Sequence, residues 1–235
     1  FKLVVWSDYV CPFCYIGKRQ LEKAIKDSGY EGQIDVEFKS FLLDPNTPVD
    51  ISESVYESLS KKYNAPIENI KTMTANVAER AKEVGLVYNF DEMKAANTVK
   101  AHRLTKWVES QSKELAKEFT EQVLQAYFIH GKAIGHNEEL LAIVESIGLS
   151  REEAEKVLKN NTFMQDVEQD IYEASQIGVR GVPFFVFEHK WGISGAQPQD
   201  VFEKTIEQAA QHIGLKKSIQ IVAEGAACTD DSCDV

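Results

Sequence analysis

The first 41 residues carry the pattern of a strand, a turn, a helix and a second strand. The run from Lys2 to Trp6 is short, apolar and rich in β-branched residues, which is typical of a strand. A helical pattern begins after Cys11, and apolar and polar residues then alternate from Ile34 to Phe41 as in a half-buried strand. The opening of the chain therefore predicts one βαβ unit, which favours an α/β fold.

The middle of the chain shows only helical patterns. Pro45 and Pro48 break the second strand, and from about Ser52 to Ile177 apolar residues recur at helical spacing. This length predicts roughly five helices, which together form a helical subdomain.

Strand character returns near the C-terminal end. The pattern of Phe184 to Phe187 predicts a strand. Glu188-His189 is expected to form the tight turn of a hairpin whose second strand runs from Lys190 to Ser194. Pro198 is expected to be the first residue of a last helix that ends near Gly214. A ββα unit thus follows the helical segment.

Charge excludes two classes of partner. The chain has 26 Lys and Arg against 37 Asp and Glu, a formal net charge of -11. This field repels phosphate backbones and anionic membrane surfaces, so neither nucleic acid nor membrane is an expected partner. No transmembrane segment and no leader is visible, which predicts a cytoplasmic protein; a secreted form whose leader has been removed would look the same.

The four cysteines form two close pairs, and the first pair indicates redox chemistry. Cys11-Pro-Phe-Cys14 lies where a strand gives way to a helix. At a helix N-terminus, unpaired N–H groups and the helix dipole favour the thiolate form of Cys11. Cys14 lies one turn inward, close enough to attack a mixed disulfide on Cys11. We therefore expect Cys11 to be the attacking thiol and Cys14 the resolving thiol.

A zinc site is the alternative reading of the cysteines. Cys11 and Cys14 could supply two ligands and Cys228 and Cys233 the other two. Pro12 at a helix start and the aromatic Phe13 favour a rigid redox turn instead, so no metal is expected. Four histidines, His130, His136, His189 and His212, also show no metal-ligand spacing.

A second motif is Gly178-Val-Arg-Gly-Val-Pro183, which ends where a strand begins. A cis Val182-Pro183 peptide would place its backbone beside the cysteines and offer hydrogen-bonding groups to an extended substrate. A trans proline that opens an edge strand is the alternative. Val182 and Pro183 are the candidate substrate-binding residues.

These motifs together resemble the DsbA-like branch of the thioredoxin fold, and within it the FrnE-like group. The resemblance covers about residues 2 to 212 and rests on three stretches, Ser7-Asp8-x-x-Cys11-Pro-Phe-Cys14-Tyr-Ile-Gly17, Ala96-Asn97-Thr98-x-x-Ala101-His102-Arg103-Leu104 and Gly181-Val-Pro183-Phe-Phe-Val, extended by Ile193-Ser-Gly-Ala-Gln-Pro198. It implies a thioredoxin fold, βαβ plus ββα, with an inserted all-helical subdomain. The implied division is a core of residues 1–44 and 179–214, a helical insertion of residues 45–178 and a tail of residues 215–235.

The resemblance implies thiol-disulfide exchange with protein or peptide thiols, with no cofactor and with glutathione as a candidate redox partner. The dipeptide between Cys11 and Cys14 is Pro-Phe, whereas better-known oxidants of the wider family have Pro-His. Phe13 cannot donate a hydrogen bond to a thiolate. The reduction potential is therefore expected nearer the middle of the range, roughly -120 to -270 mV, than at its oxidising end. The Cys-x4-Cys tail, Cys228 and Cys233, is similar to one in some FrnE-like proteins, and we interpret it as a secondary redox pair.

The related 2-hydroxychromene-2-carboxylate isomerases and kappa-class glutathione transferases give a second functional hypothesis, a glutathione-dependent enzyme acting on a small aromatic compound. In those enzymes helical-domain residues face the thiol site, so Asn97 and His102 are candidates here. A hydrogen-bonded helix histidine without a catalytic role is the other interpretation of His102. Trp107, Phe119, Tyr127 and Phe128 are expected to form the core of the helical domain.

Overall fold

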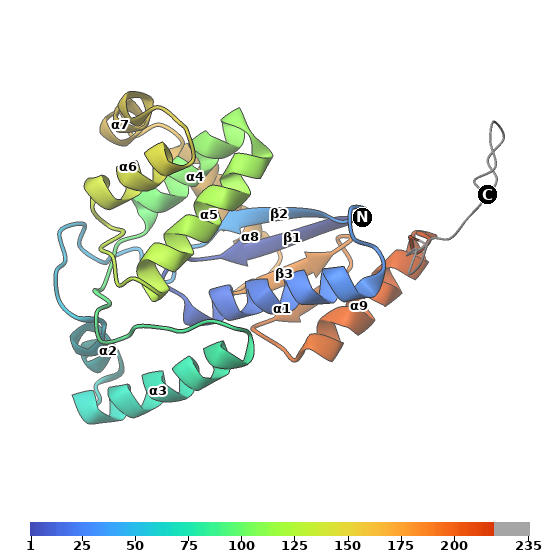
Figure 1. The fold of residues 1–235 in the computed structure, drawn as a ribbon, viewed down its shortest axis with the longest axis horizontal. Coiled ribbons are helices and arrows are strands. Elements are labelled where there is room, and N and C mark those ends of the chain that lie inside the picture. The colour runs from blue at the N-terminus through green and yellow to red at the C-terminus, as the bar shows by residue number, and fades with distance from the viewer. Residues whose placement is uncertain (219–235) are drawn as a thin grey trace, which may run out of the picture.

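Four strands form one mixed sheet in the computed structural model, which describes residues 1–218 (Figure 1). The strands are β1 (Lys2–Ser7), β2 (Asp35–Ser40), β3 (Phe184–Phe187) and β4 (Trp191–Ser194), in the order β2-β1-β3-β4. β1 pairs parallel with β2 and antiparallel with β3, and β3 pairs antiparallel with β4. The strand β1 is central, as expected for a run of buried apolar residues.

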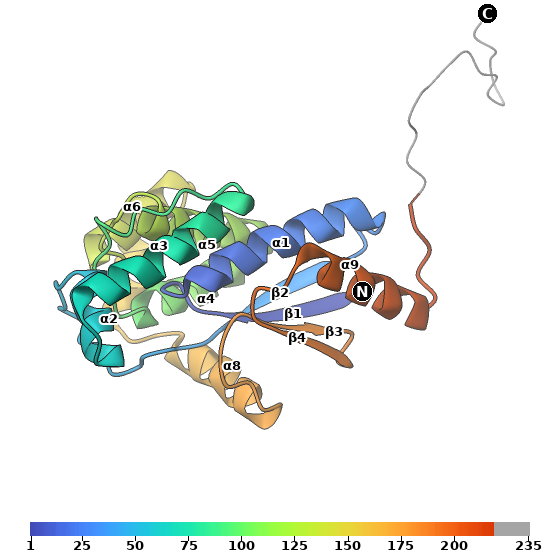
Figure 2. The ribbon, with the colours of Figure 1, turned by 90° about the horizontal axis from the view of Figure 1, so that it is seen from below.

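Helices cover both faces of this sheet (Figure 2). α1 (Pro12–Ser28) and α9 (Gln199–His212) pack against each other on one face, and α8 (Met164–Gln176) lies on the other. Leu21 of α1, Phe202 of α9 and Phe185 of β3 are fully buried in one apolar cluster. Burial of each such side chain contributes about 1.5–3 kcal/mol to folding. The predicted α/β thioredoxin fold is thus confirmed.

The segment between β2 and β3 contains seven helices, two more than predicted. They are α2 (Val55–Tyr63), α3 (Ile67–Glu83), α4 (Val99–Gln111), α5 (Lys113–Phe128), α6 (Asn137–Ser146), α7 (Arg151–Lys159) and α8. The miscount arises where periodicity does not reveal a break, as at Asn64, which has a φ of 49° and ends α2 just before α3 begins.

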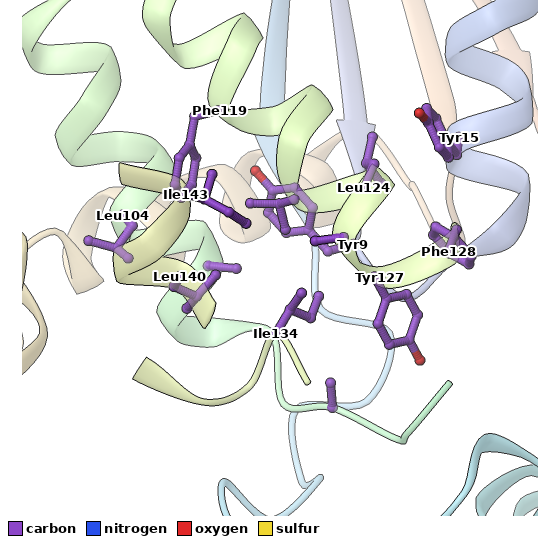
Figure 3. Close-up of a cluster of buried hydrophobic side chains, with 14 of the residues drawn as sticks. Tyr9, Tyr15, Leu104, Phe119, Leu124, Tyr127, Phe128, Ile134, Leu140 and Ile143 are labelled. Atoms are coloured by element: carbon purple, nitrogen blue, oxygen red, sulfur yellow. The ribbon is translucent and has the colours of Figure 1, made fainter. Parts of the chain in front are cut away.

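The helical segment has its own apolar core, which reaches the start of α1 (Figure 3). Trp107, Phe119, Tyr127 and Phe128 are all buried in it, as predicted. Tyr15 of α1 belongs to the same cluster. The inserted helices therefore pack directly against the helix that carries the cysteines.

The helix α8 contacts both parts of the molecule. The backbone carbonyl oxygen of Asp170 on α8 accepts a hydrogen bond from Trp6 Nε1 at 2.9 Å. The Asp170 carboxylate accepts a second hydrogen bond from the Ser40 N–H at 2.8 Å. α8 also packs against α4. The division expected at residue 178 therefore places within the insertion a helix that lies against the sheet.

Two local predictions were wrong in detail. The register pairs Phe187 with Trp191, so three residues connect β3 to β4 and β4 begins one residue later than expected. Glu188 and His189 form the corner with φ of 48° and 54°, and Lys190 is the extra residue. Pro198 is the N-cap of α9 rather than its first residue.

Across residues 1–218, none of the helices is both long and apolar enough to cross a membrane.

Candidate active site

Cys11 is the N-cap residue of α1, where the strand-to-helix turn ends. Its backbone is extended, with φ of -86° and ψ of 112°, and Pro12 opens the helix with a fixed φ and no N–H to satisfy. The Cys11 side chain thus stands where the first N–H groups of the helix lack intrahelical partners. Both Cys11 and Cys14 are thiols in the structure.

The structure brings Cys11 to the proline loop, 171 residues along the chain. The Cys11 Sγ donates to the carbonyl oxygen of Val182 at 3.4 Å, and the Val182-Pro183 bond is cis. The Pro183 carbonyl oxygen in turn accepts from the Gly195 N–H at 2.8 Å. The two sequence motifs therefore meet at one place.

Gly17 allows this close approach of α1 to the proline loop. A Cβ at this position would lie 3.1 Å from Pro183 Cγ and 3.0 Å from Phe185 Cζ. Any larger residue would push the helix away from the loop.

Cys14 has a different environment from Cys11. Its thiol is buried one turn into α1, and the backbone N–H of Asp8 lies 3.5 Å from its sulfur. Burial raises the pKa of the Cys14 thiol well above its usual range, and the hydrogen bond to Cys11 and the charge on that residue act in the same direction. Cys14 is therefore held in the protonated form at neutral pH, which disfavours it as the first attacker.

A buried carboxylate lies behind the cysteine turn. Asp8 is 1% exposed, and its Oδ1 accepts from the Thr98 hydroxyl at 2.8 Å and lies 3.0 Å from His102 Nε2. Its Oδ2 accepts from the Leu43 N–H at 2.9 Å. Asp8 thus joins the end of β1 to α4 and to the loop after β2. The structure gives His102 the partner that the sequence left unidentified.

Asn97 lies just before Thr98, the N-cap residue of α4, and makes other contacts. Its amide nitrogen donates to the Thr47 carbonyl at 2.7 Å, and its Oδ1 accepts from the Val99 N–H at 3.0 Å. These contacts tie the N-terminus of α4 to the loop that follows β2.

Two residues of the insertion border the active-site turn, and sequence reasoning missed both. The guanidinium carbon of Arg80 on α3 lies 4.9 Å from the centroid of the Phe13 ring, and Arg80 also donates to the Ala196 carbonyl at 3.3 Å. The Tyr88 hydroxyl donates to the Pro12 carbonyl at 2.6 Å. Burial, together with the charge on Cys11, raises the pKa of Tyr88, so its hydroxyl remains a donor.

The zinc site that the cysteine pairs could form cannot be assembled from the described part of the chain. Residues 1–218 contain no group of three or more His, Cys, Asp or Glu side chains placed to hold a metal ion. Cys228 and Cys233, which that reading requires, lie outside the described residues.

Comparisons with known proteins agree with this fold and geometry. An uncharacterized Bacillus subtilis protein, YwbO, is 29% identical over 210 residues, which covers 86% of this chain and 94% of the relative. The crystal structure of a probable DsbA oxidoreductase from Streptomyces coelicolor is 30% identical, with a TM-score of 0.85, and the match covers 100% of this chain and 98% of that chain. A 2-hydroxychromene-2-carboxylate isomerase shares the fold at 17% identity and a TM-score of 0.68, over 92% of this chain and 100% of that chain.

The DSBA-like thioredoxin domain family matches residues 2–207, from the first strand to within the last helix. This range includes the cysteine turn, the inserted helices and the proline loop. The chain belongs to the DSBA-like thioredoxin domain family.

Proposed function

We propose that this protein is a thiol-disulfide oxidoreductase that exchanges disulfides with protein or peptide thiols through Cys11 and Cys14. The observation that carries the proposal is the contrast between the two thiols. Cys11 caps the helix N-terminus beside the Val182 carbonyl, whereas Cys14 is buried one turn deeper with a raised thiol pKa. This contrast separates an attacking thiol from a resolving one.

In the reductive direction, the Cys11 thiolate attacks one sulfur of a substrate disulfide. The substrate S–S bond breaks, a Cys11–substrate disulfide forms, and the first substrate thiolate leaves and takes up a proton. Cys14 then loses its proton and attacks Cys11, which releases the second substrate thiolate and leaves a Cys11–Cys14 disulfide. Two electrons pass to the substrate, and the reverse sequence oxidises a substrate dithiol.

Val182 and Pro183 are proposed to bind the substrate chain. The Val182 carbonyl, which accepts from Cys11 here, lies at the attacking sulfur. An extended substrate that pairs with this backbone would have its own disulfide directed at Cys11, because main-chain pairing fixes both distance and direction. Arg80 and Phe13 lie at the border of the same turn.

Glutathione is the proposed redox partner, in a cytoplasmic setting and without a resident cofactor. A cytosolic disulfide reductase from Pseudomonas aeruginosa, DsbM, shares the fold at 15% identity and was solved with GSH. That protein's ligand suggests the partner to test here.

Cys14→Ser and Cys11→Ser variants, both built on Cys228→Ser/Cys233→Ser so that only the active-site thiols react, test the assignment. Mixed with a disulfide-bonded peptide, Cys14→Ser should accumulate a disulfide between Cys11 and the peptide, because no thiol remains to resolve it. Cys11→Ser should accumulate none, and the chain with both active-site cysteines should turn over without trapping.

The isomerase or transferase hypothesis makes the opposite prediction. Such an enzyme activates the glutathione thiol and needs no resolving cysteine. Glutathione-dependent conversion of a small aromatic compound, together with no trapped peptide in Cys14→Ser, would overturn the oxidoreductase assignment. Trapping through Cys14 in Cys11→Ser would reverse the roles of the two thiols.

A further inference from the structure

An arginine of the helical insertion connects two segments that border the active site. The guanidinium carbon of Arg80, on α3, lies 4.9 Å from the centroid of the Phe13 ring. Its Nη2 donates to the Ala196 carbonyl at 3.3 Å. Phe13 stands between the two cysteines, and Ala196 follows Gly195, whose N–H donates to the Pro183 carbonyl. Arg80 therefore contacts both the cysteine turn and the segment that supports the proline loop.

The contacts that hold Arg80 leave its charge uncompensated within the described residues. Arg19 and Arg151 pair with glutamate carboxylates. The contacts of Arg80 in residues 1–218 are instead an aromatic ring and a carbonyl oxygen, which orient the guanidinium and carry no formal charge. The Arg80 side chain is exposed, and a guanidinium is charged throughout the neutral range. It therefore presents a positive charge to solvent at the border of the site.

Such a cation matters most for a negatively charged substrate. The chain has a formal net charge of -11, and a field of this sign slows the approach of anions. A guanidinium near the reacting sulfur reverses the sign of the field locally. Its planar fork also matches the geometry of a carboxylate, which it can bind through two parallel N–H···O bonds.

We propose that Arg80 is a specificity-determining residue, which selects disulfides that carry a carboxylate close to their sulfur atoms. The proposal rests on the disulfide exchange proposed above for Cys11 and Cys14. The substrate carboxylate binds the Arg80 guanidinium while the Cys11 thiolate attacks the substrate sulfur, and the bonds formed and broken are those of the reductive direction. Glutathione disulfide and a protein segment with an acidic residue beside its cysteine both have this chemistry.

Single-turnover oxidation of the reduced protein by three small disulfides tests the charge preference. Dithiodipropionate is a dianion at neutral pH, hydroxyethyl disulfide is neutral and cystamine is a dication. Every protein carries Cys228→Ser/Cys233→Ser, so that only Cys11 and Cys14 react. Each variant is compared with the parent on the same disulfide, which cancels the intrinsic reactivity of that disulfide.

Arg80→Gln should slow the reaction with dithiodipropionate, in low salt, about fivefold relative to hydroxyethyl disulfide, because one positive charge near the reacting sulfur is lost. The reaction with cystamine should become faster. Added salt should reduce both differences. Arg80→Lys keeps the charge and should retain most of the preference.

Lys71→Gln is the matched control. Lys71 is another exposed cation on α3, and its Nζ lies 5.7 Å from the centroid of the Tyr56 ring. Its loss should leave the relative rates of the three disulfides unchanged. A fall equal to that of Arg80→Gln would mean that the preference comes from the overall charge of the protein, which would overturn the proposal.

An equal change with all three disulfides in Arg80→Gln would also overturn it, because Arg80 would then act on the packing of the turn or on the Cys11 thiolate. A parent that reacted with none of the three would refute the oxidoreductase assignment itself, and the role of Arg80 with it. These two failures are therefore distinguishable.

Two further substrates identify the source of the carboxylate. Arg80→Gln and the parent are compared on glutathione disulfide and on a peptide disulfide that has either Asp or Asn beside its cysteine. A loss with glutathione disulfide alone assigns Arg80 to glutathione. A loss with the Asp peptide but not with the Asn peptide assigns it to acidic protein segments. No loss with glutathione disulfide or with the Asp peptide would contradict the proposal.

Discussion

His102 Nε2 lies 3.0 Å from the Asp8 carboxylate oxygen Oδ1, and both side chains are buried. The two residues are 94 positions apart, one at the end of β1 and the other on α4. The backbone N–H of Asp8 also contacts the Cys14 sulfur. This pair therefore anchors the inserted helices to the strand end from which the cysteine turn starts.

His102→Ala is expected to lower the free energy of unfolding by about 1–3 kcal/mol, because it removes one hydrogen-bonding partner from a buried carboxylate. Urea denaturation of the reduced protein measures the change. His130→Ala removes the same side chain from an exposed position and serves as the control. A loss no larger than that of His130→Ala would show that the Asp8–His102 contact does not stabilise the fold.

Local sequence patterns predicted the elements that carry the site. The βαβ opening, the strand after Pro183 and the last helix follow from short-range periodicity and turn residues, and the position of Cys11 at a helix start follows from them. The contacts of Asp8 with His102 and of Arg80 with Phe13 could not be predicted in this way, because each joins distant segments through tertiary packing. Asp8 had a sequence signal, its place in Ser7-Asp8-x-x-Cys11, but no local rule identifies a partner on α4.

The stability of the reduced protein is expected to fall as the pH rises above about 8.5, the usual pKa of an unfolded thiol. The folded state raises the pKa of Cys14, chiefly through burial, so it favours the protonated thiol. This stabilisation is fully present below the unfolded pKa and is lost progressively toward the higher folded pKa. Urea denaturation of the reduced chain between pH 8 and 9.5 measures the slope, with each sample kept reduced.

Cys14→Ala provides the comparison for that slope. It lacks the titrating thiol, so its stability should depend less on pH than the parent's over the same interval. Tyr9, whose pKa is raised to about 12 by burial and not by Cys14, contributes equally to both proteins. Identical slopes would mean that the Cys14 thiol is not perturbed by folding.

Phe13→His should make the active-site disulfide more oxidising. An imidazole at this position can donate a hydrogen bond to the Cys11 thiolate, which stabilises the reduced form, whereas Phe13 has no donor. The Arg80 guanidinium over the Phe13 ring would repel a protonated imidazole and limit the gain. We expect a rise in potential of at least about 30 mV, equivalent to about 1.4 kcal/mol, in equilibration with a glutathione buffer.

Phe13→Leu separates the hydrogen bond from the loss of the aromatic ring. Leucine removes the contact with Arg80 without adding a donor, so its potential should stay close to that of the parent. If Phe13→His and Phe13→Leu shifted the potential equally, the effect would come from the lost ring and not from a new hydrogen bond.

The secondary redox role of Cys228 and Cys233, which lie outside the described residues, predicts a kinetic effect without a stability effect. Their loop is short and close to the chain end, so a disulfide there removes little unfolded-state entropy from the folded domain. Asp230, Asp231 and Asp234 disfavour a thiolate nearby, so this pair is better suited to receive a disulfide from Cys11 than to attack a substrate first. Cys228→Ser/Cys233→Ser should therefore slow the return of the Cys11–Cys14 disulfide to two thiols and lower reductase turnover, while the melting temperature stays within about 1 °C of the parent's. Unchanged turnover and unchanged kinetics of disulfide exchange at Cys11 would reduce the pair to passive thiols.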